Sequence, residues 1–165
     1  MGSTARPGYT ANRLATAHAG FFLIAGLWPL LHIGSFQWVT GPKTDTWLVK
    51  TVGTLIAVAG AVSLNAARSP RPLSAETVAL LNGISASLGY ISFHYARQGR
   101  ISRIYYLDAL AEAALLATWA AVLAAERAEK DERKADVPSF ALADGRNAPR
   151  PAFNGLRAMR GQETS

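Results

Sequence analysis

The stretch that most constrains this chain is the apolar run at residues 104–125, which carries two acidic side chains. The run is about 22 residues long, and about 20 apolar residues in a helix cross the hydrocarbon core of a bilayer. It therefore predicts a membrane-spanning helix. Asp108 and Glu112 lie one helical turn apart within it, and an acidic group inside such a helix costs about 2.5–3.5 kcal/mol on insertion scales. Other groups in the chain must offset that cost.

The distribution of charge extends this prediction to the rest of the chain. Hydrophobic residues make up 50% of the sequence and charged residues only 17%, and the charges gather near the termini and in short connections. We predict an all-α fold, a four-transmembrane-helix bundle at residues 14–125. The predicted spans lie at about residues 14–34, 47–67, 76–96 and 104–125. A mobile N-terminus at 1–13 precedes them, and a charged helix extension with a disordered tail follows at 126–165.

Amino-acid composition also excludes several kinds of site and partner. The chain has no cysteine, which excludes disulfides, thiolate metal sites and cysteine nucleophiles. Its net charge of +6 would suit nucleic acid, but basic residues beside apolar spans are explained by orientation in a membrane, so no nucleic-acid partner is expected. More Lys and Arg lie on the side of the termini, which predicts that both termini are cytoplasmic. No signal-peptide pattern is present.

Small residues and helix-end signals predict how the spans pack. Pro29 should kink the first span. Gly53 and Gly60 share a face of the second span and should permit close approach of another helix. Ser74 is expected to cap the third span. A row of small residues runs along that span, at Ala79, Gly83 and Ser87.

The ionisable residues of the spans fall at similar predicted depths. Antiparallel spans place five of them in the outer half of the bundle: His32, Lys50, His94, Asp108 and Glu112. One interpretation is a polar pocket that binds a ligand or relays protons. The simpler alternative is that Lys50 neutralises one carboxylate, the other is protonated or hydrogen-bonded, and the histidines lie at the headgroups. A second, inner layer holds His18, Asn65 and Asn82.

The same residues limit the metals and cofactors that the chain can hold. Two histidines and two carboxylates can ligate zinc or iron, and the candidate ligands are His32, His94, Asp108 and Glu112. A bis-histidine haem is possible only between His32 and His94. No cofactor is expected.

The connection between the first two spans contains a distinctive motif. Gly41 and Pro42 predict a tight turn, Lys43 and Asp45 can pair or cap the next span, and Trp47 is placed at the interface. The connection is either a lid over the pocket or a rigid link.

This motif carries a resemblance. Residues 25–53, AGLWPLLHIGSFQWVTGPKTDTWLVKTVG, are similar to a pattern in an uncharacterised family of small bacterial four-span membrane proteins with a VTGPKTDxWLVxTVG-like loop. The pair Asp108 and Glu112 resembles the last helix of that group. The resemblance implies a bacterial inner-membrane protein and no particular activity. More distantly, the layout resembles the DoxX-like and EXPERA families, and EXPERA members use intramembrane acids in a lipid- or sterol-binding cavity.

Two classes of function are therefore predicted. The first is an accessory or ligand-binding membrane protein that takes a lipid-like molecule and packs against other membrane subunits or its own copies. The second is a membrane enzyme or proton-coupled carrier that uses the intramembrane carboxylates and histidines.

Overall fold

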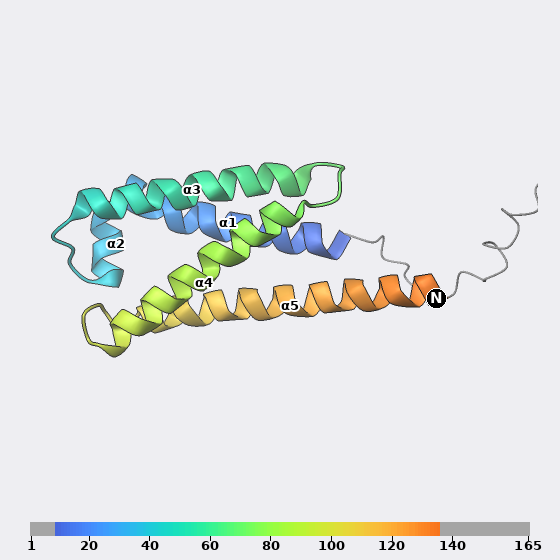
Figure 1. Cartoon of the computed structure of the whole chain (residues 1–165). Helices are drawn as coiled ribbons and strands as arrows, with labels where there is room; N and C mark the ends of the chain where they lie inside the picture. The colour runs from blue at the N-terminus through green and yellow to red at the C-terminus, as the bar shows by residue number, and fades with distance from the viewer. Residues whose placement is uncertain (1–8, 136–165) are drawn as a thin grey trace, which may run out of the picture. The chain divides into compact units, whose positions relative to one another are not determined.

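The computed structural model describes residues 9–135, and this part of the chain is all-helical, with no strand. Its five helices are α1 (Tyr9–Leu31), α2 (Ile33–Thr40), α3 (Thr46–Arg68), α4 (Ala75–Arg97) and α5 (Tyr105–Ala135). The chain divides into two compact units, residues 1–128 and 129–165, and the helix packing below concerns the first. Within it, α1 and α4 run in one direction and α3 and α5 in the other (Figure 1).

Three of these helices are long and apolar enough to cross a membrane: Thr10–Leu31 of α1, Thr46–Arg68 and Tyr105–Ala135. The membrane-capable, all-α character of the prediction is confirmed. Helix α4 has the same length as α3, 23 residues, but it is less apolar because it carries Asn82, Ser85 and Ser92.

The first helix differs from its predicted bounds at both ends. It begins at Tyr9, so residues 9–13 of the predicted N-terminal segment are helical, while residues 1–8 lie outside the described part. It ends at Leu31, two residues after Pro29, because His32 leaves helical geometry at φ −148° and ψ 77°. His32 instead opens α2, where its Nδ1 atom accepts a hydrogen bond from the Ser35 amide at 3.0 Å. The predicted connection after the first span is therefore partly helical.

Helices α1 and α3 approach each other at glycines. A Cβ atom built on Gly26 would lie 2.5 Å from the Gly53 carbonyl oxygen, and one on Gly60 would lie 2.9 Å from the carbonyl oxygen of Ala19. Only glycine allows backbones to come this close. The predicted close approach through Gly53 and Gly60 is confirmed, and α1 is the partner helix.

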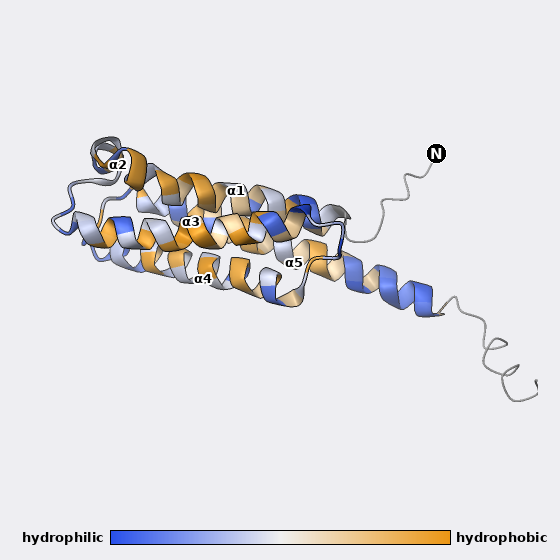
Figure 2. Ribbon diagram, turned by 90° about the horizontal axis from the view of Figure 1, so that it is seen from above, coloured by the Kyte–Doolittle hydropathy of each residue, from blue (hydrophilic) through white to orange (hydrophobic). Residues whose placement is uncertain are grey.

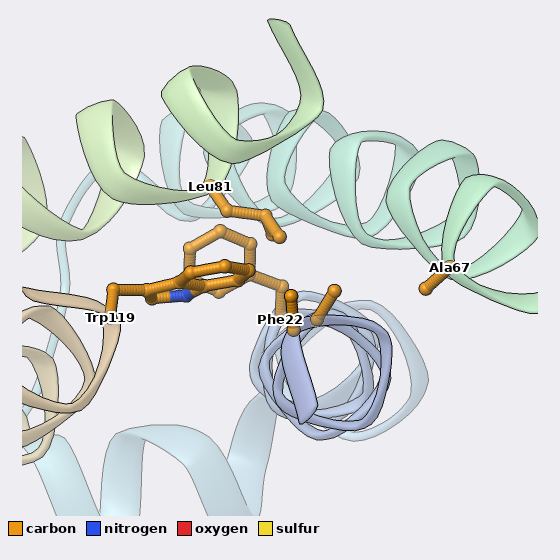
Figure 3. Packing of buried hydrophobic residues seen from close by; sticks show 6 residues of the cluster. Phe22, Ala67, Leu81 and Trp119 are labelled. Atoms are coloured by element: carbon orange, nitrogen blue, oxygen red, sulfur yellow. The ribbon is translucent and has the colours of Figure 1, made fainter. Parts of the chain in front are cut away.

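A second packing centre joins α1, α4 and α5. Phe22, Leu81 and Trp119 come from these three helices and are fully buried against one another (Figure 3). Ala11, Ala15 and Ala67 complete the buried cluster. Trp119 thus holds α5 against two helices far from it in sequence.

The ends of α4 and α5 follow the sequence signals. Ser74 caps α4 by accepting a hydrogen bond from the Thr77 amide at 3.3 Å, as predicted. Helix α5 continues to Ala135, so residues 126–135 of the predicted extension are helical, and Figure 2 shows its last turns as hydrophilic. Arg133 pairs there with Glu129 at 3.5 Å. The predicted disordered tail, from residue 136 onward, lies outside the described residues.

Candidate functional site

Glu112 is a buried acid at the contact between α4 and α5. Its side chain is only 1% exposed. Gly89 on α4 lies opposite, and a Cβ atom there would approach the Cβ atom of Glu112 to 3.2 Å. The absence of a side chain at Gly89 therefore makes room for the acid between the two helices.

The carboxyl group of Glu112 has little to compensate its burial. Among the described residues, neither of its oxygens has a partner at standard hydrogen-bond geometry. The hydroxyl of Ser85 is the side-chain donor that interacts with it. A buried carboxylate without paired charges is strongly unfavourable, so this group is under pressure to take up a proton.

Ser85 belongs to a hydrogen-bonded chain that reaches across the bundle. The indole Nε1 atom of Trp119 donates to His18 Nδ1 at 3.0 Å, and His18 Nε2 lies 2.8 Å from Ser85 Oγ. Indole is only a donor, so Nδ1 of His18 must be the acceptor and the neutral ring carries its proton on Nε2. His18 then donates to Ser85, whose own hydroxyl proton is available for Glu112. The direction of every bond in this chain follows from Trp119.

The three members of this chain are all buried. His18 and Ser85 are fully inaccessible and Trp119 nearly so. Phe22 packs edge-on against the His18 ring at 4.6 Å between centroids. Phe22 and Trp119, two side chains that contact the His18 ring, belong to the cluster that holds α1, α4 and α5 together (Figure 3).

Asp108 lies one turn before Glu112 and has a defined partner. The hydroxyl of Ser92 on α4 donates to Asp108 Oδ2 at 2.7 Å. Ser85, Gly89 and Ser92 therefore form a polar face of α4 that meets the acidic face of α5. A serine of the neighbouring helix thus offsets the cost of Asp108, whereas Glu112 has no hydrogen bond of this geometry.

The connection between α2 and α3 contacts the start of α5. Lys43 donates from Nζ to the Thr40 carbonyl oxygen at 3.0 Å, and Nζ lies 5.1 Å from the centroid of the Tyr105 ring. Partial burial lowers the pKa of Lys43 from its usual value. Tyr105 in turn interacts electrostatically with Asp108. The lysine of the loop motif is thus linked through one aromatic ring to the acidic face.

The other motif residues have structural positions. Gly41 ends α2 with φ +87°, a backbone conformation that favours glycine, in agreement with the predicted turn at Gly41 and Pro42. Asp45 occupies the N-cap position of α3 without a side-chain cap hydrogen bond. Trp47 is 67% exposed at the start of α3.

Among residues 9–135, no hydrogen bond or ion pair joins the other three residues of the predicted outer pocket to the acids. His32 is exposed and caps α2, and Lys50 is exposed. His94 stacks on Tyr90 and its Nε2 atom lies 2.8 Å from the side-chain nitrogen of Gln98. Serines, and not Lys50, therefore face Asp108 and Glu112.

The proposed metal ligands are not brought together either. Within residues 9–135, no group of three or more His, Asp or Glu side chains is placed to hold a metal ion. This includes the predicted set of His32, His94, Asp108 and Glu112. His32 Nδ1 and His94 Nε2, one nitrogen of each histidine of the predicted haem pair, make local hydrogen bonds.

Sequence reasoning missed the partners of the acids. It placed His18 in an inner layer with Asn65 and Asn82, whereas His18 bonds to Ser85 and Trp119, Asn65 is exposed, and Asn82 donates to Val78 of its own helix. A signal for the serines exists. Ser85 and Ser92 are seven residues apart with Gly89 between them, and so share the face that a pair of acids at i and i+4 can meet.

Comparison of the chain with protein-family models, with curated proteins and with solved structures finds no match. The geometry of the Glu112 site therefore carries the functional argument alone.

Proposed function

We propose that this chain is an integral membrane protein that takes up and releases a proton at Glu112, and that it couples this proton to an activity of the membrane domain. The observation that carries the proposal is a buried acid without a geometrically paired oxygen at the end of a directed hydrogen-bond chain. A bound proton removes the charge that makes the burial of Glu112 costly.

The chain of Ser85, His18 and Trp119 fixes the surroundings of this proton. His18 carries its own proton on Nε2, which donates to Ser85, and its Nδ1 atom accepts from Trp119. The ring therefore has no acceptor for a proton from Glu112, and the proton stays on the Glu112 carboxyl group. Ionisation of Glu112 strengthens the interaction that the Ser85 hydroxyl makes with it, and this change is passed through His18 to Trp119.

The proposal includes four spans in a bacterial inner membrane with both termini in the cytoplasm. Helix α4 connects the end of α3 to the start of α5, and these two points lie at opposite ends of the bundle in Figure 1. It must therefore cover the same distance as the three apolar helices. The bacterial origin rests on the resemblance of residues 25–53, and the placement of the termini rests on the distribution of Lys and Arg.

Infrared difference spectroscopy of detergent-solubilised protein tests the proton site directly. As the pH is raised, the wild type should lose the infrared absorption band of a protonated carboxyl group. The Glu112→Gln variant should lack this band at every pH. Asp108→Asn is the matched control, because Asp108 is already bonded to Ser92. Absence of any Glu112-dependent band between pH 4 and pH 10 would contradict the proposal.

A second candidate function is an accessory subunit or a binding protein for a lipid-like molecule. The specific observation is that Ala79, Gly83 and Ser87 form an exposed row on α4, with open space around the Cα atom of Gly83. Small exposed rows allow close approach of another helix or an acyl chain. Native mass spectrometry with lipid extraction tests this candidate. A stoichiometric lipid or subunit that is lost in Gly83→Leu, but not in Gly20→Leu, would support it.

A further inference from the structure

Polar and apolar side chains divide the interior of the bundle along its length. Along α5, the order from its start is Tyr105, Asp108, Glu112 and Trp119, which spans about 21 Å at 1.5 Å per residue. Along the facing stretch of α4, the order is Ser92, Gly89, Ser85 and then Leu81. Both series begin polar at the end that carries α2, and both become apolar at the level of Trp119 and Leu81.

The side chains packed directly against the far side of Trp119 are apolar. The fully buried Leu81 and Phe22 pack with Trp119 (Figure 3), and Val78, Val122 and Leu123 pack against this cluster. Asn82 on this side satisfies its amide within α4. Glu126, which has one buried oxygen without a partner, lies seven residues beyond Trp119, about 10 Å along α5. The directed hydrogen-bond chain ends at the indole of Trp119, because an indole nitrogen donates a hydrogen bond and does not accept one. The chain therefore offers a proton no acceptor beyond Trp119.

The near side offers a stepwise route to the acid. Asp108 lies about 6 Å along the helix from Glu112 and is half-buried, with Ser92 on one of its oxygens. Tyr105 and the amine of Lys43 lie between Asp108 and the end of the bundle. The charged or titratable groups around Glu112 are thus Asp108 from α5, His18 from α1 and, at the end of the route, Tyr105 and Lys43. Helix α4 contributes only the uncharged Ser85 and Ser92.

We propose that Glu112 exchanges its proton with water on one face of the membrane only, the face at which Lys43 and the α4–α5 connection lie, and that Asp108 is the relay group on this route. The inference rests on the proposed proton uptake at Glu112. It places Lys43 and Tyr105 at the water-facing end of the proton route, so the loop motif at residues 41–45 has a role at the entrance to the site.

Trp119 provides the probe. A variant with Trp28→Phe, Trp38→Phe and Trp47→Phe retains Trp119 as its single tryptophan, and the emission of this indole should respond to the charge of Glu112, to which it is linked through His18 and Ser85. The protein is reconstituted into vesicles of uncharged lipid, and the pH is changed on one side at a time. Because the chain has no cysteine, Thr44→Cys and Ala75→Cys, labelled with a membrane-impermeant maleimide, identify the two faces.

The emission of Trp119 is expected to follow the pH on the face at which Cys at position 44 is labelled, and to ignore the pH on the face of position 75. Asp108→Asn should slow the response severalfold without changing its final amplitude. Glu112→Gln should abolish it. An equal response to both faces, or a response to the opposite face, would overturn the one-sided route.

Failure of this inference is distinguishable from failure of the proposed function. If detergent-solubilised protein shows a Glu112-dependent carboxyl band but the vesicles respond from both faces, only the one-sided route is wrong. If the band is absent, the proposed proton uptake itself is wrong, and the one-sided route falls with it.

Discussion

The contact between α1 and α3 and the contact between α4 and α5 hold helices together in opposite ways. In the first, glycines take the positions of closest approach, so that backbones meet near Gly26 and Gly53. In the second, a glycine is also present, but Gly89 makes room for an acid, and serines fill the remaining positions. Inside a membrane, where apolar side chains gain little by leaving lipid, close packing and hydrogen bonds are the available sources of stability.

The comparison indicates that the two contacts have different roles. The glycine contact leaves its atoms no room to move and contains no titratable group, so it is unsuited to a change that depends on protonation. The serine and acid contact depends on the protonation of its members. We therefore expect stability to be most sensitive to substitutions in the first contact and proton binding to be sensitive only to those in the second.

The largest effect is expected for Gly26→Ala. The added Cβ atom would lie 2.5 Å from the Gly53 carbonyl oxygen and 2.6 Å from the Ala57 amide nitrogen, which are backbone atoms and cannot rotate away. Overpacking of this kind costs about 1–3 kcal/mol, and we expect the upper end. Unfolding by SDS in mixed micelles measures it. Gly20→Ala, where nothing lies within 4 Å, is the control, and equal losses in both variants would contradict the close contact.

A smaller loss is expected for Trp119→Phe. The substitution removes the donor to His18 Nδ1 while retaining most of the aromatic packing, and an unsatisfied buried acceptor costs about 1–3 kcal/mol. The same SDS titration measures this loss. Trp38→Phe is the matched variant, because Trp38 is 87% exposed, and it should leave the free energy of unfolding nearly unchanged. If both variants unfold like the wild type, the indole–imidazole bond does not contribute to stability.

A loss of about 0.5–1 kcal/mol is expected for Lys43→Met, because the ammonium group lies over the Tyr105 ring. Its matched control is Lys50→Met, since Lys50 is exposed at the start of α3. Thermal unfolding of the two variants at neutral pH compares them. If Lys50→Met lost more stability than Lys43→Met, the contact between Lys43 and Tyr105 would not be the more important one, and the structural role of the loop motif would be contradicted.

The smallest effect on stability is expected for Glu112→Gln. The amide has nearly the shape of the protonated acid and adds no charge, so at acidic pH the free energy of unfolding should change less than in the three variants above. Proton uptake should nevertheless be lost. A variant that fails to fold at every pH would show that the charge of Glu112 is structural, which would break the contrast between the two contacts.

Much of the fold followed from the sequence because it depends on local rules. Apolar length predicted the helices, Ser74 predicted the start of α4, and the spacing of Gly53 and Gly60 predicted a close crossing. The end of α1 was missed because it depends on the backbone at His32 and on its bond to Ser35, which no hydropathy pattern records.

The acids of the site were predicted, and their partners were not. Asp108 and Glu112 stand out because charge is rare in an apolar run. Depth along the helices could not show which faces turn toward them, and so it grouped them with His32, Lys50 and His94. Ser85 and Trp119 carry no charge, and only the rotation of α4 and α5 about their axes reveals their role.

The buried position of Glu112 has an electrical consequence. A charge that reaches Glu112 from one face crosses part of the membrane potential, which acts with about 2.3 kcal/mol per elementary charge for each 100 mV across the full bilayer. Under the proposed one-sided exchange, the occupancy of the site at constant pH would therefore change with voltage. A protein with this arrangement would sense the sum of the two components of the proton-motive force.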